Sequence, residues 1–366
     1  MAAATPGGPP EDGLVDWLLD ADPALQWRVE RDVVHAPPEV WEATRARVAT
    51  EGFGARLLAL QDPDGQWAGG AYFPADVGAV DAATDAAYDA GGRPEEGQPW
   101  TATTWSLVAL REWGLDPGVL RARRTPELLA AHSRWEYDDL PYWGGEVDWC
   151  INGYTLAAGA WLGVDVSELL AAVLAGRLPD GGWNCAWVEG ATVSSFHSTL
   201  NALKGLLAYQ ELASGSDELR AARRSGEEYL LRRGLFRRLS TGEPVGDWVF
   251  RLAYPFRWYY SVLNALVYLR EASLLDGTPP DPRAADAVEH VRRARRPDGT
   301  WLQGRRHPGR VWFEVDAPAG EPSRWLTYHA TVVLDWWDGA GRQDVGAPDT
   351  TSAPSSTAMS SSNHST

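Results

Sequence analysis

The sequence predicts an all-α fold in which an inner ring of about five or six helices is surrounded by outer helices. The turn Pro-Asp-Gly-x-Trp occurs three times, at 63–67, 179–183 and 297–301. Apolar helical segments also alternate along the chain with amphipathic ones, as two layers of helices require. No run with the period of a strand is longer than a few residues.

The repeated turn has a structural interpretation. Asp and Gly favour a tight turn, and the following Trp67, Trp183 or Trp301 is expected to pack between the two layers. The inner helices are predicted from small-residue-rich segments that are apolar almost all round, at 100–114, 150–163, 196–211, 258–272 and 325–337. The outer helices are predicted from more charged segments at 40–61, 125–132, 167–176, 217–234 and 282–294.

Composition limits the possible functions. The 366 residues are 44% hydrophobic. Their number alone suggests two or three domains, but a closed repeat fold can hold such a chain in one. A net charge of −17 argues against nucleic acid or an anionic membrane surface as a partner. Two cysteines do not form a disulfide framework, which predicts a reducing cytoplasm. No apolar run reaches the ~18 residues of a membrane span, and the N-terminus has no signal-peptide pattern.

Three regions are expected along the chain. They are a flexible N-terminus at 1–10, one helical domain at 11–338 and a low-complexity, disordered tail at 339–366. Within the domain, "GRVWFEV" at 309–315 is expected to form a short strand or an extended flap over the rim of the ring.

The Asp-Gly-x-Trp turns resemble the QW repeats of squalene and other terpene cyclases, and the glycine-rich turns of protein prenyltransferase β subunits. The chain is also similar to actinobacterial proteins labelled squalene cyclase-like, with "GEV-x-x-CING", "DGGWNC", "SSFH" and "VWFE" in this order. The resemblance covers about residues 11–338 and implies the α/α toroid that these families share. It also implies a large hydrophobic, isoprenoid-like substrate.

The inner helices of a toroid begin near one end of the ring, so residues at equivalent starts converge on one rim. Aligning the inner segments places four residues in one column, Thr104, His197, Tyr260 and Tyr328. Cys150 falls beside this column, and we therefore expect Asp148, Cys150 and His197 to meet on adjacent inner helices. Tyr260, Tyr328 and Thr104 are expected to line a central cavity and contact the substrate.

A carboxylate, a thiolate and an imidazole form a good zinc set, and three protein ligands leave a fourth position open. Prenyltransferase β subunits carry Asp-x-Cys on one inner helix and His on a following one, which implies Asp148, Cys150 and His197 as ligands here. Cys185 is a second thiolate candidate that replaces or joins Asp148, as the Cys/Cys/His zinc site of lanthionine cyclases implies. The alternative is that both cysteines are small buried hydrophobes and His197 is a core residue.

The resemblance fails at two places. Prenyltransferases hold a diphosphate with bases just before the Asp-x-Cys, whereas 138–147 carries acids and no base. Arg257 and Arg324, both at inner-helix starts, are the candidate substitutes for these bases, with solvated or carboxylate-paired arginines as the alternative. Class II terpene cyclases use a DxDD acid, and the nearest match here, 136–139, places Asp138 in a loop. Asp138 as general acid and Glu146 as general base or partner of the metal site are the catalytic candidates, with solvated surface acids as the alternative.

Three functions remain open from the sequence. The first is a zinc enzyme acting on an isoprenoid-like substrate in an aromatic-lined cavity. The second is a metal-free cyclase with a degenerate acid motif, and the third is a toroid that binds a lipophilic ligand or a peptide without catalysis. The sequence favours the first because Asp-x-Cys and His occupy matching positions in neighbouring repeats.

Overall fold

The computed structural model describes residues 13–76, 98–213 and 215–344, and these residues are mostly helical. Within this part of the chain the strands are β1 (Trp301–Leu302) and β2 (Pro322–Ser323), which form one short antiparallel pair. The prediction of an all-α fold is confirmed. The expected flexible N-terminus at 1–10 and most of the expected tail at 339–366 lie outside the described residues, although the last helix continues to Asp344.

The inner segments predicted from the sequence form helices at nearly the expected bounds. They are α6 (Thr103–Glu112), α9 (Trp149–Leu162), α11 (Phe196–Leu212), α13 (Val262–Asp276) and α15 (Arg324–Asp344). The helix α2 (Pro23–Asp32) was not predicted and takes the next position in the same series.

The remaining helices are shorter or more amphipathic. They are α1 (Leu14–Leu19), α3 (Pro38–Arg47), α4 (Gly52–Leu58), α7 (Pro117–Ala122), α8 (Thr125–His132), α10 (Ser167–Ala175), α12 (Asp217–Leu231) and α14 (Ala285–Arg293). Four short 3-10 helices also occur in the described residues, η2 (Tyr142–Gly144), η3 (Cys185–Glu189), η4 (Asp247–Phe250) and η5 (Pro282–Ala284). The segment 40–61 was expected to be one helix and is divided into α3 and α4.

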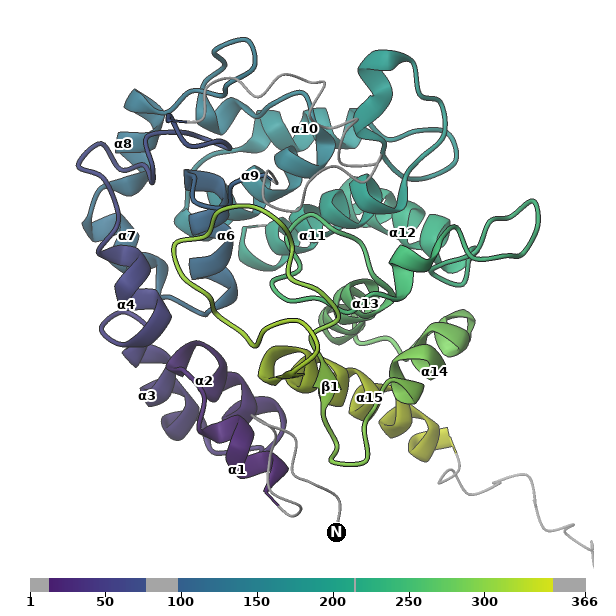
Figure 1. Ribbon diagram of the computed structural model, residues 1–366. Helices are drawn as coiled ribbons and strands as arrows, with labels where there is room; N and C mark the ends of the chain where they lie inside the picture. The colour runs from purple at the N-terminus through teal and green to yellow at the C-terminus, as the bar shows by residue number, and fades with distance from the viewer. Residues whose placement is uncertain (1–12, 77–97, 214, 345–366) are drawn as a thin grey trace, which may run out of the picture.

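The helices follow one another around a closed circuit (Figure 1). Contacts run from α2 through α4, α6, α9, α11 and α13 to α15, and α15 contacts α2 again. Figure 1 shows α7, α8, α10, α12 and α14 outside this circuit. The backbones of α9 and α11 approach closely at two glycines. A Cβ atom at Gly205 would stand 2.5 Å from the carbonyl oxygen of Gly153. Glycine at both positions therefore lets the two backbones meet.

The repeated turn joins the two layers in the same way at each copy. The indole N–H of Trp67, Trp183 and Trp301 donates to a carbonyl ten residues earlier, at distances of 2.9, 2.7 and 2.7 Å. The amide of each tryptophan donates to a threonine hydroxyl on the following inner helix, at 3.1 Å in all three cases. All three indoles are fully buried, which confirms the structural interpretation of the turn.

The segment after β1 crosses the centre of the ring (Figure 1). Trp100 donates two hydrogen bonds to this segment. Its amide donates to Arg310 O and its indole N–H donates to Pro308 O, both at 2.7 Å. The indole of Trp312 donates to Thr101 O at 3.0 Å. Residues 309–315 are therefore an extended flap held by hydrogen bonds, and they do not form the short strand that was the other expectation.

Candidate metal centre

Ligand atoms of Asp148, Cys150 and Cys185 all lie within 4.8 Å of one another, and each residue is partly buried. Asp148 is the N-cap of α9, and Cys150 belongs to the first turn of that helix. Cys185 begins η3 in the loop that leads to α11. The two Sγ atoms are 3.4 Å apart, and the Cys150 amide approaches the Cys185 sulfur at 3.4 Å. The start of one inner helix and the loop before the next thus converge on one small site.

The first turn of α11 fixes the position of Cys185. The Cys185 amide donates to the Ser198 hydroxyl at 3.0 Å, and this hydroxyl lies 3.2 Å from the Cys185 sulfur. Ser195, the N-cap of α11, donates its hydroxyl to Ser198 at 2.9 Å. Since Asn184 also accepts from the Ala186 amide, the backbone on both sides of Cys185 is held in place.

Glu146 fixes the other side of the site. Its carboxylate accepts from the Asp148 amide at 2.6 Å, while the Glu146 backbone is bound by the Asn152 side chain through two hydrogen bonds of 2.7 and 2.6 Å. Burial raises the pKa of Glu146, and the nearby carboxyl groups of Glu136 and Asp138 raise it further. Glu146 therefore supports the turn that presents Asp148.

Negative charge on one candidate ligand opposes the ionisation of its neighbours. The neighbouring Cys185, burial, and the charges of Asp148 and Glu146 raise the pKa of the Cys150 thiol well above its usual range. A bound divalent cation reverses this effect, because it favours thiolate and carboxylate over their protonated forms. Two sulfurs and one carboxylate form a donor set that fits zinc.

The structure does not bring His197 to this group. No described histidine joins the three residues within the 4.8 Å that relates them. The His197 ring packs instead against Trp248 and Trp258, with centroid distances of 4.7 and 5.6 Å. Burial, with Arg305 nearby, lowers the pKa of His197 to about 4. Adjacent residues on a helix point about 100° apart, and it is Ser198 rather than His197 that faces Cys185.

The other members of the expected column are held inside the protein. The Thr104 hydroxyl is 3.1 Å from the hydroxyl of Tyr142, and the Tyr260 hydroxyl donates to Leu235 O at 2.6 Å. Tyr328 donates to the carboxylate of Asp32, and burial raises the pKa of Tyr328 to about 12. The three residues do not line two pockets in the described part of the chain, one at the centre of the ring and one beside the start of α11. The geometry gives them packing roles.

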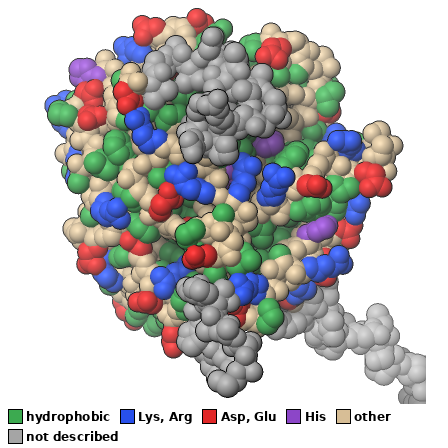
Figure 2. All heavy atoms as spheres, in the orientation of Figure 1, with side chains coloured by type: hydrophobic (Ala, Val, Ile, Leu, Met, Phe, Trp, Pro, Cys, Tyr) green, Lys and Arg blue, Asp and Glu red, His purple; other side chains and the backbone are tan. Residues whose placement is uncertain are grey.

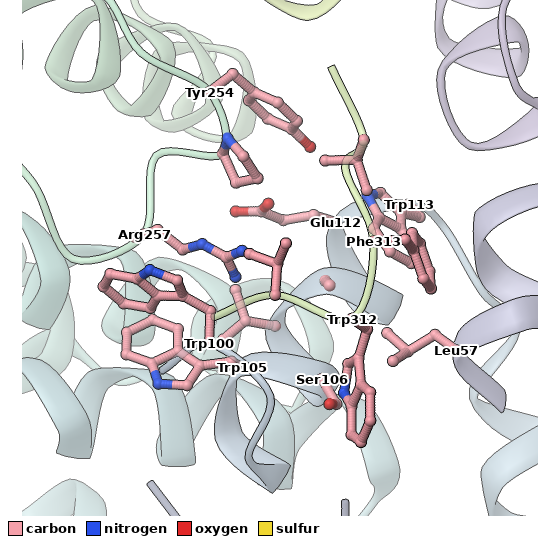
Figure 3. Close-up of a pocket in the computed structure, with 15 residues that line it drawn as sticks. Leu57, Trp100, Trp105, Ser106, Glu112, Trp113, Tyr254, Arg257, Trp312 and Phe313 are labelled. Carbon is pink, nitrogen blue, oxygen red and sulfur yellow. The ribbon is translucent and has the colours of Figure 1, made fainter. Parts of the chain in front are cut away.

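Arg257 lines a pocket at the centre of the ring, here named the central pocket (Figure 3). Its guanidinium carbon lies 4.9 Å from the centroid of the Trp100 ring, and burial lowers the pKa of Arg257 to about 10. Figure 3 shows Glu112 and Arg257 pointing into the same space. The remaining walls combine aliphatic side chains with the aromatic side chains of Trp105, Trp113, Tyr254, Trp312 and Phe313.

The central pocket has a volume of about 40 Å³, which is room for a few water molecules. Val311, Trp312 and Phe313 of the flap form part of its wall. Glu112 was not among the candidates from the sequence, although a carboxylate near the end of the largely apolar segment 100–114 was a signal. The flap residues could not be assigned to this wall from local patterns.

An aromatic layer connects the metal centre with the central pocket. Trp105 contacts Tyr72 and Tyr154 at centroid distances of 5.0 and 5.5 Å. Burial raises the pKa of both tyrosines well above the usual value, and the charge of Cys150 is the next contribution in each case. Trp105 lines the pocket, whereas the two tyrosines lie close enough to the candidate ligands to be affected by their charge.

Asp138 is exposed and lies in the turn between Arg134 and Pro141, which form an isolated bridge. Its φ of 55° is in the left-handed region. The structure therefore keeps Asp138 in a solvated loop, as the sequence placed it. On the face of the molecule in Figure 2, acidic and basic side chains are interspersed rather than segregated.

Comparisons of the chain with protein-family models, with curated proteins and with solved structures gave no match. Among the described helices, none combines the length and the apolar character that a membrane crossing requires.

Proposed function

We propose that this chain is a zinc-binding α/α toroid, similar to terpene cyclases and prenyltransferases, that acts on a large apolar, isoprenoid-like substrate. The observation that carries the proposal is the convergence of Asp148, Cys150 and Cys185 within 4.8 Å. The closed circuit of helix contacts from α2 to α15 supports the toroid, since each inner helix then begins beside its neighbour.

Asp148, Cys150 and Cys185 would hold the metal. Three protein ligands leave a fourth position for water or substrate, which is the arrangement of catalytic rather than structural zinc. All three residues are partly exposed, and this supports access to that position. Zinc in such a site supplies a lowered pKa for a bound thiol or water, or polarises a substrate oxygen. Glu146 and Ser198 orient the ligands through the hydrogen bonds described above.

The central pocket is the proposed substrate site. Its tryptophans offer faces that stabilise developing positive charge by cation–π contact, while Arg257 and Glu112 offer polar groups that orient the substrate. A volume of about 40 Å³ is too small for an isoprenoid, so binding requires displacement of the flap that carries Trp312 and Phe313. The flap would then exclude water when it closes over the bound substrate.

The metal-free cyclase receives less support than the zinc enzyme. A carboxylic acid that protonates an alkene needs a buried environment, and Asp138 is exposed. A non-catalytic toroid that binds a lipophilic ligand or a peptide is the other alternative, and a large ligand would require the same displacement of the flap.

The test is the metal content of the purified protein beside three variants. We expect about one zinc ion per chain in the wild type, with loss in Cys150→Ala and Cys185→Ala and retention in His197→Ala. Isoprenoid alcohols and diphosphates are then incubated with the protein before and after chelation, and products are followed by mass spectrometry. Turnover that survives both chelation and Cys150→Ala would contradict a zinc enzyme. Bound zinc without any turnover would favour the non-catalytic alternative.

A further inference from the structure

A second pocket, here named the arginine pocket, lies where the start of α11 meets the end of α12 and the segment 235–248. Its polar walls include Ser195, His197, Arg233, Arg237 and Arg238, and its volume is about 350 Å³. The lining contains no carboxylate, although the chain as a whole has a net charge of −17. We propose that the arginine pocket binds a soluble phosphate monoester.

Two of the arginines carry charge that no described carboxylate neutralises. Arg233 uses Nη1 to donate to Tyr229 O at 2.9 Å, and Arg238 uses Nη2 to donate to Val245 O at 2.9 Å. Neither forms an ion pair within the part of the chain that the structure describes. Arg237 differs, because it pairs with Asp286 at 2.8 Å. Arg233 and Arg238 therefore keep both their charge and free N–H donors for an anion.

The structure holds these guanidinium groups in position. The Arg233 guanidinium carbon lies 3.7 Å from the centroid of the Tyr229 ring, and the Tyr229 hydroxyl is itself hydrogen-bonded to Ser194 O. Arg238 is exposed, and its guanidinium is held by the hydrogen bond from Nη2 to Val245 O. A preorganised arginine side chain loses little conformational entropy when it binds an anion. Its planar guanidinium can also donate to two phosphate oxygens at once.

The N-terminus of α11 adds to the positive electrostatic potential of the arginine pocket. This helix has 17 residues, and its first two residues, Phe196 and His197, both line the pocket. Their amides have no acceptor among the described residues. The positive end of the helix dipole therefore acts together with the arginines on a bound anion.

The apolar part of the lining distinguishes an organic ester from inorganic phosphate. Phe196 and Trp248 form part of the wall, and Val193 and Leu239 are 59% and 57% exposed where they border it. An apolar group attached to the phosphate would cover these side chains. The inference is independent of the zinc site, because Asp148, Cys150 and Cys185 do not line the arginine pocket.

The experiment is calorimetric titration of the full-length protein at low ionic strength with hexyl phosphate, inorganic phosphate and hexanol. We expect hexyl phosphate to bind more tightly than inorganic phosphate, and hexanol not to bind. Arg238→Gln should weaken hexyl phosphate about tenfold, as the loss of one charge-assisted hydrogen bond predicts. Arg233→Lys keeps the charge but loses the fork and should also weaken binding.

The matched control is Arg232→Gln. Arg232 is the neighbour of Arg233, pairs with Glu228 at 3.8 Å and does not line the pocket, so the same loss of charge should leave affinity within about twofold. Thermal melting of each variant checks the fold. Cys150→Ala should keep the phosphate affinity, which separates this proposal from the zinc site.

Three results would overturn the proposal. If wild type, Arg238→Gln and Arg233→Lys bind hexyl phosphate with equal affinity, the two arginines do not contact the ligand. Binding of hexanol as tight as that of hexyl phosphate would leave only an apolar groove. The protein could also bind vesicles that contain phosphatidic acid but fail to bind hexyl phosphate. The arginines would then recognise a phosphate of a membrane lipid instead of a soluble ester.

Discussion

The Sγ atoms of Cys150 and Cys185 lie 3.4 Å apart, although 35 positions separate the two residues in the chain. They are the only cysteines of the sequence, and both are free thiols. One belongs to the start of α9 and the other precedes α11, and these are the two helices whose backbones approach at Gly153 and Gly205. The close packing of α9 and α11 thus places two sulfurs and the Asp148 carboxylate in one site.

Zinc should protect both thiols from a disulfide reagent such as dithionitrobenzoate. Metal-bound thiolates react slowly, so we expect the rate to fall at least about tenfold on adding zinc and to recover with a chelator. In Cys150→Ala the remaining Cys185 should lose this protection. A rate that does not respond to zinc in the wild type would show that the two sulfurs are not ligands.

Asp148→Asn should lower zinc affinity by about tenfold or more, because the amide cannot supply an anionic oxygen. Glu146→Gln should have a smaller effect, up to about tenfold, since Glu146 acts through the Asp148 amide. Competition with a chromophoric chelator measures both. Asp139→Asn, in the exposed loop, is the control, and an equal loss in all three variants would indicate a general charge effect instead.

His197 should make the protein less stable as the pH falls from about 6.5 to about 4. Folding lowers the pKa of His197 from 6.5 to about 4, so in this range His197 binds more protons in the unfolded chain than in the folded one. The free energy of unfolding therefore decreases as pH falls, by at most about 1.4 kcal/mol per pH unit for this group.

The variant His197→Gln has no imidazole to titrate at this position. Its free energy of unfolding should therefore change less with pH than that of the wild type, and the difference is the contribution of His197. Urea unfolding at several pH values, in buffers without phosphate, provides the comparison. Parallel curves for the two proteins would mean that His197 titrates equally in the folded and unfolded chains.

Trp183→Phe should lower the free energy of unfolding by about 1–3 kcal/mol, because it leaves the buried carbonyl of Val173 without its donor. Trp187→Phe removes a similar bond to Val147 O from a side chain that is 43% exposed, where water replaces the donor. Denaturant unfolding should therefore show a smaller loss for Trp187→Phe. The opposite order would contradict the role of the repeated turn in joining the layers.

Phe313→Ala should open the central pocket. Phe313 contacts Phe53 and Trp113 at centroid distances of 5.9 and 6.4 Å, and these contacts hold the flap across the ring. We expect a fluorescent apolar probe to bind faster in this variant, with zinc content unchanged. Leu274→Ala removes an exposed apolar side chain elsewhere and should match the wild type. Uptake as slow as in the wild type would mean that the flap does not limit access.

The sequence by itself determined the features that depend on local periodicity. Segments that are apolar almost all round became α9, α11 and α13. The Asp-Gly-x-Trp turns became the junctions between layers, because both patterns act over a few residues. It also placed Asp148 and Cys150 together at a helix start, since two positions along the chain cannot lie far apart.

Only the tertiary structure decided what meets Cys150. The rotation of α11 about its own axis brings Ser198 and, through it, Cys185 to the metal centre, and directs His197 toward Trp248. Tyr260, which precedes α13, donates to the carbonyl of Leu235 instead of facing a cavity. The flap over the central pocket and the grouping of Arg233 with Arg238 also depend on contacts between distant segments. Side-chain direction and long-range packing are set by the whole fold, and no local pattern in the chain carries them.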